Sequence, residues 1–213
     1  MLAGYGSWEA AEPDRARIAA VQTSEPQPPS ARETLLEGLR ADGLVIGEVT
    51  LASGRTAQYY VDARRALLRP AAFRATGELV ADEAHRLGAV AVGGPTLGAD
   101  PVACSVLAAA DDLNAFIVRK ERKEHGLQRW IEGPAIEPGD RALVVEDVVT
   151  SGGSLVAAIE RVREEGIEIA GALAVLDRLA GGGDAIERAL GDGIPYVALL
   201  TIDDVYPDRP DRP

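Results

Sequence analysis

The sequence predicts an α/β protein with an open parallel sheet and helices on both faces. Short runs rich in valine and isoleucine alternate with longer stretches of helical spacing, which is the βαβ pattern. Prolines and glycines stand where these helical stretches are expected to start and stop. The 213 residues make up about one ordinary domain with a single core.

The elements follow from local signals. The first helix is expected after Ser30, because Ser30 and Glu33 have capping-box spacing ahead of an apolar pattern. A longer helix is expected from Pro70 to Gly88, which have the residue types of a helix start and a helix stop. The later elements are expected to be strand 89–92, helix 100–110, strands 115–118 and 142–145, a helix ending at Gly166, strand 169–176, helix 184–190 and strand 196–202. Ligands are then expected at the carboxyl ends of the strands.

Both ends of the chain lack a sustained period. Residues 1–29 end in a proline-rich stretch and are expected to be a flexible extension. Residues 207–213 repeat Asp-Arg-Pro and are expected to be a flexible tail. The folded domain is therefore predicted to span residues 30–206.

Composition excludes several classes of protein. The net charge of −12 argues against binding nucleic acid through bulk electrostatics. No apolar run approaches the roughly 20 residues of a membrane helix. The single cysteine, Cys104, excludes an internal disulfide and a cysteine metal cluster, as is typical of a reducing cytoplasm.

Segment 142–154, ALVVEDVVTSGGS, is the most specific part of the chain. A buried strand runs into Glu146 and Asp147 and then into a turn of small residues that opens a helix. Such a turn offers backbone N–H groups and hydroxyls to a phosphate, and Gly152 and Gly153 permit close approach. Since a phosphate repels carboxylates, the two acids are expected to face sugar hydroxyls or a magnesium ion. A sugar phosphate satisfies both demands, whereas a plain connection with a polar turn is the alternative.

Segment 119–126, RKERKEHG, concentrates positive charge in an otherwise acidic chain. Four cations, Arg119, Lys120, Arg122 and Lys123, stand within five positions. Any polyanion that the protein binds must be met by a local basic patch of this kind. A solvated basic loop is the alternative.

These two segments carry a resemblance to a known family. Segment 142–154 resembles the phosphoribosyl pyrophosphate motif of the type I phosphoribosyltransferases. Segment 119–126 resembles the loop of the orotate phosphoribosyltransferases in that family, with an Arg-Lys pair at a strand end followed by Lys-x-His-Gly. The resemblance implies the type I phosphoribosyltransferase fold with a small N-terminal hood, mainly residues 30–66.

Two further segments extend the resemblance over roughly residues 35–202. Segment 50–62, TLASGRTAQYYVD, is similar to the family's N-terminal signature, which packs over the pyrimidine; an edge strand with a turn is the alternative. In the family, the arginine of a segment such as VLDR, here Arg178, binds the carboxylate of orotate, and a guanidinium can do so through two parallel hydrogen bonds. A surface ion pair of Arg178 with Asp177 is the alternative.

The resemblance assigns roles to individual residues. Lys123, His125 and Asp147 are expected to be catalytic. Phosphoribosyl pyrophosphate is expected to contact Arg119, Lys120, Lys123, His125, Glu146, Asp147, Val148, Val149, Thr150, Ser151, Gly152, Gly153 and Ser154. Orotate is expected to contact Thr150 and Arg178.

The chain also departs from the family pattern. Ala52 and Gly98 stand where many relatives have lysine, which removes two cations. Gly93 and Gly94 are expected to let the backbone approach the pyrophosphate, because glycine tolerates the conformations of a tight anion loop.

The implied activity is a step of pyrimidine nucleotide synthesis in the cytoplasm, in which orotate and phosphoribosyl pyrophosphate give orotidine 5′-monophosphate and pyrophosphate. Mg²⁺ is expected to arrive largely on the pyrophosphate, with no resident metal site assigned. The implied assembly is a homodimer in which loop 119–133 completes the partner's site. One rival is a purine-type phosphoribosyltransferase, which Arg178 and the Lys-x-His loop argue against. Another is a noncatalytic regulator that senses phosphoribosyl pyrophosphate, which needs a DNA-binding module.

Overall fold

A six-stranded sheet with the order β5-β4-β3-β6-β7-β8 forms the centre of the protein. The computed structural model describes residues 28–50, 56–122 and 129–212. Neighbouring strands run parallel except β5, which pairs antiparallel with β4 at one edge. The strands are β3 (Ala91–Pro95), β4 (Asn114–Val118), β5 (Ile131–Glu132), β6 (Arg141–Val149), β7 (Glu168–Asp177) and β8 (Tyr196–Thr201). The open parallel sheet is confirmed, and its antiparallel edge strand was not predicted.

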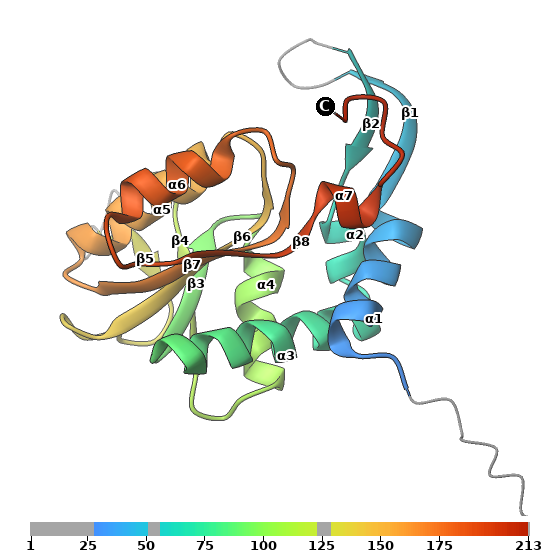
Figure 1. Ribbon diagram of the computed structural model, residues 1–213. Coiled ribbons are helices and arrows are strands. Elements are labelled where there is room, and N and C mark those ends of the chain that lie inside the picture. Colours follow the sequence, from blue (N-terminus) through green and yellow to red (C-terminus); the bar gives the residue numbers. More distant parts are fainter. Residues whose placement is uncertain (1–27, 51–55, 123–128, 213) are drawn as a thin grey trace, which may run out of the picture.

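Helices cover both faces of this sheet, as predicted (Figure 1). One face carries α3 (Pro70–Leu87), α4 (Asp100–Ser105) and the 3₁₀ turn η3 (Val106–Ala108), and the other carries α5 (Gly153–Glu164) and α6 (Gly182–Leu190). Strand side chains alternate between the two faces, so Val145 joins the α3 and α4 core while Val144 joins the α5 and α6 core. Burial on both faces explains the unbroken apolar runs of the central strands.

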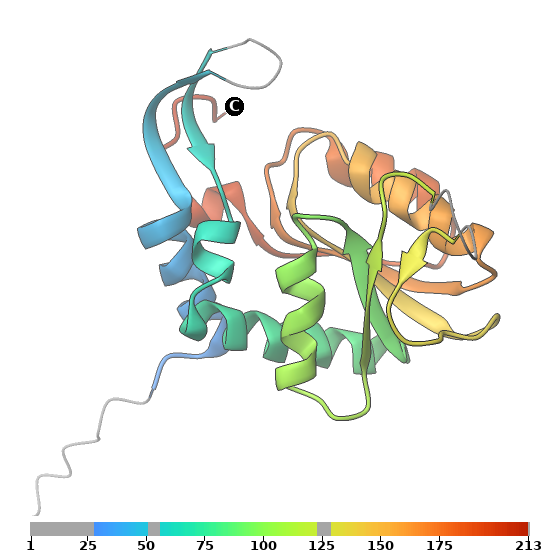
Figure 2. The same ribbon diagram turned by 180° about the vertical axis from the view of Figure 1, so that it is seen from behind.

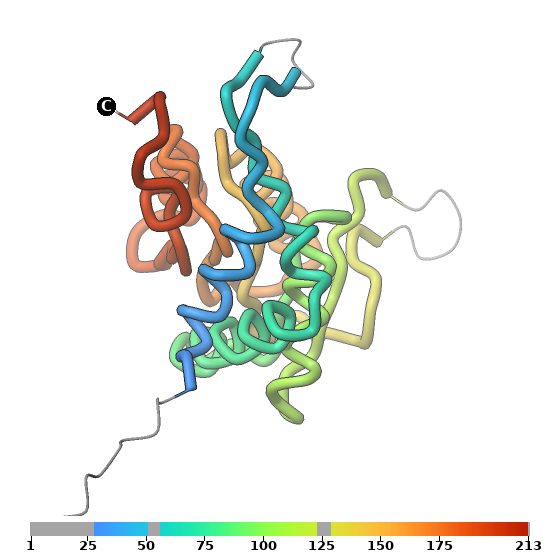
Figure 3. Tube along the Cα trace, turned by 90° about the vertical axis from the view of Figure 1, so that its right-hand side faces the viewer, coloured from blue at the N-terminus to red at the C-terminus, as the bar shows by residue number. Residues whose placement is uncertain are grey.

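The predicted hood lies to one side of the sheet (Figures 1 and 2). It contains α1 (Ala31–Gly38), the π-helical turn η2 (Leu39–Gly43), the antiparallel hairpin of β1 (Leu44–Thr50) and β2 (Thr56–Val61), and α2 (Arg64–Leu67). Leu35 and Leu39 are fully buried and belong to the same core cluster as Val80 of α3. The hood is therefore packed onto the main domain through α3, which Figure 3 shows passing beneath it.

Two helix boundaries follow directly from the capping residues. Ser30 caps α1, with its backbone N–H donating to Glu33 Oε2 at 2.8 Å and its Oγ accepting from the Glu33 backbone N–H at 3.3 Å. Helix α3 has Pro70 at its first turn and ends at Gly88, which adopts the left-handed conformation with φ of 67°. Both boundaries agree with the prediction.

Other boundaries differ from the prediction. Strand β3 lies two residues later at its start than expected, and β6 continues to Val149, because Val148 and Val149 pair with Leu176 and Asp177 of β7. The helix expected over 100–110 ends its α-helical part at Ser105 and continues as the short turn η3. The longer β6 places the two carboxylates inside the paired part of the strand.

The segment from residue 207 to 212, expected to be a flexible tail, is packed against the hood instead. It follows α7 (Ile202–Val205), and the Arg209 residue is only 7% exposed. Its guanidinium forms ion pairs with Asp203 and Asp211. The acids and arginines of this segment therefore pair with one another. A prediction of flexibility from composition does not take such pairing into account.

Within the described residues, no helix is long and apolar enough to cross a membrane. Residues 1–27 of the expected extension 1–29 lie outside the described residues.

Candidate functional site

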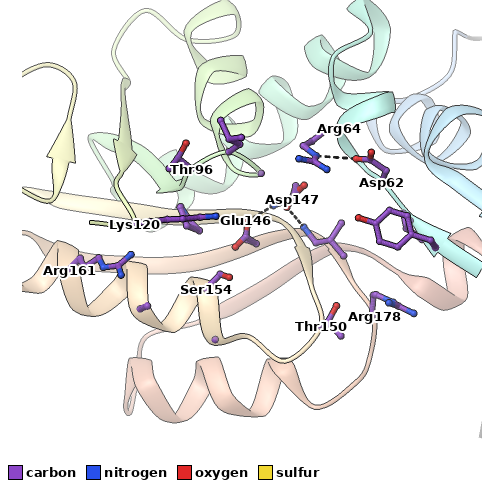
Figure 4. Close-up of a pocket in the computed structure, with 18 residues that line it drawn as sticks. Asp62, Arg64, Thr96, Lys120, Glu146, Asp147, Thr150, Ser154, Arg161 and Arg178 are labelled. Atoms are coloured by element: carbon purple, nitrogen blue, oxygen red, sulfur yellow. Dashed lines mark hydrogen bonds and ion pairs between the residues drawn. The ribbon is translucent and has the colours of Figure 1, made fainter. Parts of the chain in front are cut away.

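A cleft of about 710 Å³ opens where β3 and β6 end, between the sheet and the hood (Figure 4). In the sheet, β3 has β4 as its neighbour on one side and β6 on the other. The strand order therefore changes direction between β3 and β6. Such switch points are where open α/β sheets bind ligands. Among the residues predicted for the site, the cleft is lined by Lys120, Glu146, Asp147, Val148, Thr150, Gly153, Ser154 and Arg178.

Two adjacent carboxyl groups stand at the centre of the cleft. Glu146 is 7% exposed, and its Oε1 accepts from the Asp147 backbone N–H at 3.3 Å. Asp147 Oδ1 accepts from the Val148 backbone N–H at 2.8 Å. Burial, reinforced by the charge of Asp147, raises the pKa of Glu146 to about 9. This shift favours the protonated form of Glu146 at neutral pH, beside the more exposed Asp147.

The turn after β6 forms a second pocket of about 160 Å³ beside the main cleft. Val149, Ser151 and Gly152, which do not line the main cleft, line this pocket. Gly152 has a φ of 79°, and a Cβ there would lie 2.7 Å from the Gly182 carbonyl oxygen. Glycine is thus required at this position, and it starts the 12-residue helix α5 with its N-terminus toward the pocket. The combination suits a phosphate.

Arg178 follows the end of β7 and lines the same cleft. Its backbone N–H donates to the Val149 carbonyl at 2.9 Å, which ties it to the end of β6. The Asp177 carboxylate is occupied elsewhere, accepting from the Leu179 backbone N–H at 2.7 Å and from the Tyr196 hydroxyl at 2.8 Å. The alternative of an Arg178–Asp177 ion pair is therefore wrong, and the guanidinium is available to a ligand.

The basic segment divides into residues with different surroundings. Lys120 lines the cleft, whereas Arg119 lines neither pocket and pairs with Glu132 at 3.1 Å. Arg122 pairs with Glu164 at 2.8 Å on α5. Lys123 and His125, predicted to be catalytic, lie outside the described residues. The described part of the segment therefore brings one cation, not several, into the cleft of its own chain.

Five further polar residues line the cleft although none was assigned a ligand contact: Tyr60, Asp62, Arg64, Thr96 and Arg161. Tyr60 and Asp62 belong to segment 50–62, which was expected to pack over the pyrimidine. Figure 4 places Asp62 and Arg64 on the hood side, where Arg64 Nε lies 3.1 Å from Asp62 Oδ1. Arg161 extends from α5 two turns beyond Ser154, a helical spacing that sequence reasoning could have used. Its guanidinium stacks 4.6 Å from the Trp130 ring centroid.

The glycines before the cleft have structural reasons of their own. A Cβ at Gly93 would lie 2.3 Å from the Phe116 ring, and one at Gly94 would lie 1.9 Å from the Val145 carbonyl oxygen. These glycines therefore allow close packing inside the sheet, and neither of them lines the cleft. The expected backbone approach to pyrophosphate stays a prediction. At Gly98, a Cβ would lie 2.4 Å from Asp147 Oδ1, so a side chain there requires Asp147 to move.

Comparisons with known proteins agree with this geometry. Residues 66–189 match the family model described as Phosphoribosyl transferase domain. The chain is 46% identical over 176 residues to the orotate phosphoribosyltransferase of Corynebacterium glutamicum (strain R), covering 82% of this chain and 94% of that one. It is also similar to a crystal structure of Mycobacterium tuberculosis orotate phosphoribosyltransferase in complex with Fe(III) dicitrate, with a TM-score of 0.74, 42% identity, and coverage of 83% and 99%.

A second crystal structure of the M. tuberculosis enzyme, in complex with 5-phospho-alpha-D-ribosyl 1-diphosphate, matches with a TM-score of 0.70 and 38% identity over 82% of this chain and 98% of that one. Sequence and structural similarity therefore extend over almost the full length of these relatives. The chain belongs to the orotate phosphoribosyltransferase family.

Proposed function

We propose that this protein transfers the ribose 5-phosphate of phosphoribosyl pyrophosphate to orotate, giving orotidine 5′-monophosphate and pyrophosphate. One observation carries the proposal: a single cleft combines a phosphate-type turn, a carboxylate pair and an arginine that has no carboxylate partner among the described residues. A sugar phosphate and an anionic base can bind there side by side. The activity belongs to pyrimidine nucleotide synthesis.

The turn and the carboxylates are proposed to bind different parts of the sugar phosphate. The 5′-phosphate fits the pocket formed by residues 148–155, where α5 begins. Asp147 and Glu146 stand next to it and suit the ribose hydroxyls. A protonated Glu146 can both donate to and accept from a hydroxyl, so its raised pKa is compatible with this role.

Magnesium enters the proposal as part of the substrate. The described residues contain no group of three or more potential metal ligands. A cation bound to the pyrophosphate oxygens would need only the few oxygen ligands that the cleft offers, as magnesium sites at substrate phosphates commonly do. Mg²⁺-phosphoribosyl pyrophosphate is therefore the form that we expect the cleft to bind.

The base is expected to bind between the hood and Arg178. The guanidinium can pair with the orotate carboxylate through two hydrogen bonds. Thr150, at the turn, lines the cleft beside it (Figure 4). Recognition of a carboxylate distinguishes orotate from the neutral purine bases.

The reaction needs no covalent intermediate with the protein. A ring nitrogen of orotate forms a bond to the anomeric carbon while the bond from that carbon to the pyrophosphate oxygen breaks. The proton of that nitrogen is released, and the departing pyrophosphate can take it up. Positive charge grows on the ribose ring, where Asp147 can stabilise it. Lys120, together with Lys123 and His125 from outside the described residues, is proposed to neutralise the departing pyrophosphate.

We further propose a cytoplasmic homodimer in which loop 119–133 of each subunit reaches the partner's cleft. Arg119 supports this arrangement, since its side chain does not line the cleft of its own chain. Reciprocal delivery of the loop suits a two-fold interface, where the same surface is used twice.

The proposed activity is tested by following orotate consumption by ultraviolet absorbance with phosphoribosyl pyrophosphate and Mg²⁺ present. Adenine and hypoxanthine serve as competing bases. Consumption of a purine in place of orotate would assign the protein to the purine-type enzymes. Binding of phosphoribosyl pyrophosphate without turnover of any base would point to a sensor instead of an enzyme.

A further inference from the structure

The C-terminal segment 206–211 connects the edge of the core to the hood. The chain leaves β8, forms α7 and then returns towards the hairpin (Figures 1 and 2). Arg209 anchors the segment, since its side chain is 5% exposed and its Nε lies 3.2 Å from Asp211 Oδ1. Its second ion pair, with Asp203, fixes it to α7. We call residues 206–211 the tail latch.

The tail latch holds one side chain of the hood, Tyr59 of β2. The Tyr59 hydroxyl donates to Asp211 Oδ2 at 3.0 Å. The ring of Tyr206 meets the Tyr59 ring edge-on, with centroids 5.5 Å apart and planes at 82°. Tyr59 is only 3% exposed. The tail latch therefore contacts Tyr59 twice, at the hydroxyl through Asp211 and at the ring through Tyr206.

The Tyr59 ring in turn contacts Arg178. The Arg178 guanidinium carbon lies 5.1 Å from the Tyr59 ring centroid, within the range of a cation–π interaction. Arg178 Nε is buried and has no hydrogen-bond partner in the described part of the chain. The aromatic ring therefore provides a contact that can orient this guanidinium before a ligand arrives.

We propose that the tail latch positions Arg178 for the base, acting from Arg209 through Asp211 and Tyr59. This inference rests on the proposed function, which assigns the orotate carboxylate to Arg178. Tyr59 and the latch residues do not line the cleft, so they are positioning residues and do not touch the substrate. Their influence should fall on the base and spare the sugar phosphate, whose turn lies after β6.

The test compares Asp211→Ala with a matched control, Asp208→Ala. Both changes remove one negative charge from the same segment, but Asp208 is exposed and makes no side-chain hydrogen bond or ion pair within the described residues. Asp211→Ala is expected to raise the dissociation constant for orotate about 3- to 10-fold, the range of one lost hydrogen bond. Calorimetry should find that Asp211→Ala leaves phosphoribosyl pyrophosphate binding unchanged. Asp208→Ala should change the binding of neither orotate nor phosphoribosyl pyrophosphate.

Two conservative variants keep the test independent of folding. Tyr59→Phe removes only the hydroxyl and should weaken orotate binding as much as Asp211→Ala does. The variant that combines Tyr59→Phe with Asp211→Ala should bind orotate no more weakly than either single variant. Asp211→Asn retains an acceptor oxygen and should restore most of the affinity.

Unchanged orotate affinity in both Asp211→Ala and Tyr59→Phe would overturn the proposal, as would equal losses for orotate and phosphoribosyl pyrophosphate. The proposed function fails separately, through absence of orotate turnover in the unaltered protein. If turnover is present and the variants leave orotate affinity intact, only the latch is refuted.

Discussion

Glu146 shows how a single buried carboxyl group links the site to stability. Its pKa is raised to about 9, mainly by burial and secondly by the charge of Asp147. In the unfolded chain a glutamate has an ordinary pKa near ~4.3. Between these two values the folded state keeps a proton that the unfolded state releases, so the free energy of unfolding falls as pH rises. The stabilising protonated form is fully present below the lower pKa and is lost through the higher one.

Glu146→Gln should therefore flatten the pH dependence of stability. Between roughly pH 5 and pH 9, we expect the free energy of unfolding of the unaltered protein to fall by about 2 kcal/mol relative to that of this variant. Urea unfolding at several pH values measures it. Glu160→Gln, which changes an exposed carboxyl on α5, is the control. Parallel profiles for the unaltered protein and Glu146→Gln would contradict the raised pKa.

Arg178 carries the prediction about base recognition. Arg178→Ala should weaken orotate binding by about 2–5 kcal/mol, as for a desolvated charge pair that loses one partner. Binding of phosphoribosyl pyrophosphate should stay nearly intact, because its turn lies after β6. Calorimetry with each ligand separately decides between these effects, with the exposed Arg188→Ala on α6 as control. Equal losses for both ligands would make Arg178 structural.

Residues that are contiguous in sequence could be predicted, and residues brought in by packing could not. Glu146, Asp147 and the turn after them belong to one strand-turn-helix segment, so the motif itself places them together. Asp62 and Arg64 reach the cleft only because the hood packs on α3. The signature 50–62 indicated that the hood covers the base, but the contact of these two side chains with the cleft depends on tertiary packing.

At the level of elements, the turn before α5 depends on the conformational freedom of Gly152. Gly152→Ala should cost about 1–3 kcal/mol of stability for a left-handed alanine, with a further loss from the approach to the Gly182 carbonyl oxygen. It should also weaken phosphoribosyl pyrophosphate binding by distorting the phosphate pocket. Gly139→Ala is a matched control, because Gly139 has a φ of 92° but a Cβ there meets nothing within 4 Å.

Chemical denaturation and calorimetry separate the two effects of this change. Gly139→Ala should lose stability alone, whereas Gly152→Ala should lose both stability and sugar phosphate affinity. If the two variants lose equal stability and Gly152→Ala binds normally, the close approach to Gly182 has no consequence for the site.

The elements also show where sequence patterns reach their limit. Helix caps at Ser30 and Gly88 were predictable because capping is a local interaction. The two-residue strand β5 was not, since it exists only through pairing with β4. The packed tail escaped prediction for a similar reason, because Arg209 becomes buried only between Asp203 and Asp211 and against the hood.

At the scale of the whole molecule, the cleft is formed by parts that are distant along the chain. The sheet supplies the phosphate turn and Arg178, the hood supplies Asp62 and Arg64, and the tail latch joins the two. Substrate binding should therefore stabilise the association of hood and core, since it contacts both at once. Of the basic residues that the resemblance assigns to the pyrophosphate, Lys120 lines the cleft, whereas Lys123 and His125 lie outside the described residues.

A second subunit can supply those cations, and subunit exchange tests this directly. Lys123→Ala subunits and Asp147→Ala subunits are each expected to be inactive as homodimers. If loop 119–133 acts on the partner's cleft, a heterodimer holds one site with both defects and one site with neither. Random exchange makes about half of the dimers heterodimers, each with one intact site of two, so roughly a quarter of the unaltered activity should return under two-fold symmetry.

Native mass spectrometry confirms the exchange, and the orotate assay measures the recovered rate. A mixture of Lys123→Ala with unaltered subunits provides the reference for additive activity without complementation. Activity that stays at the level of the separate variants despite complete exchange would mean that the loop serves its own subunit. In that case the Arg119–Glu132 ion pair would have to open for Arg119 to reach the cleft of its own chain.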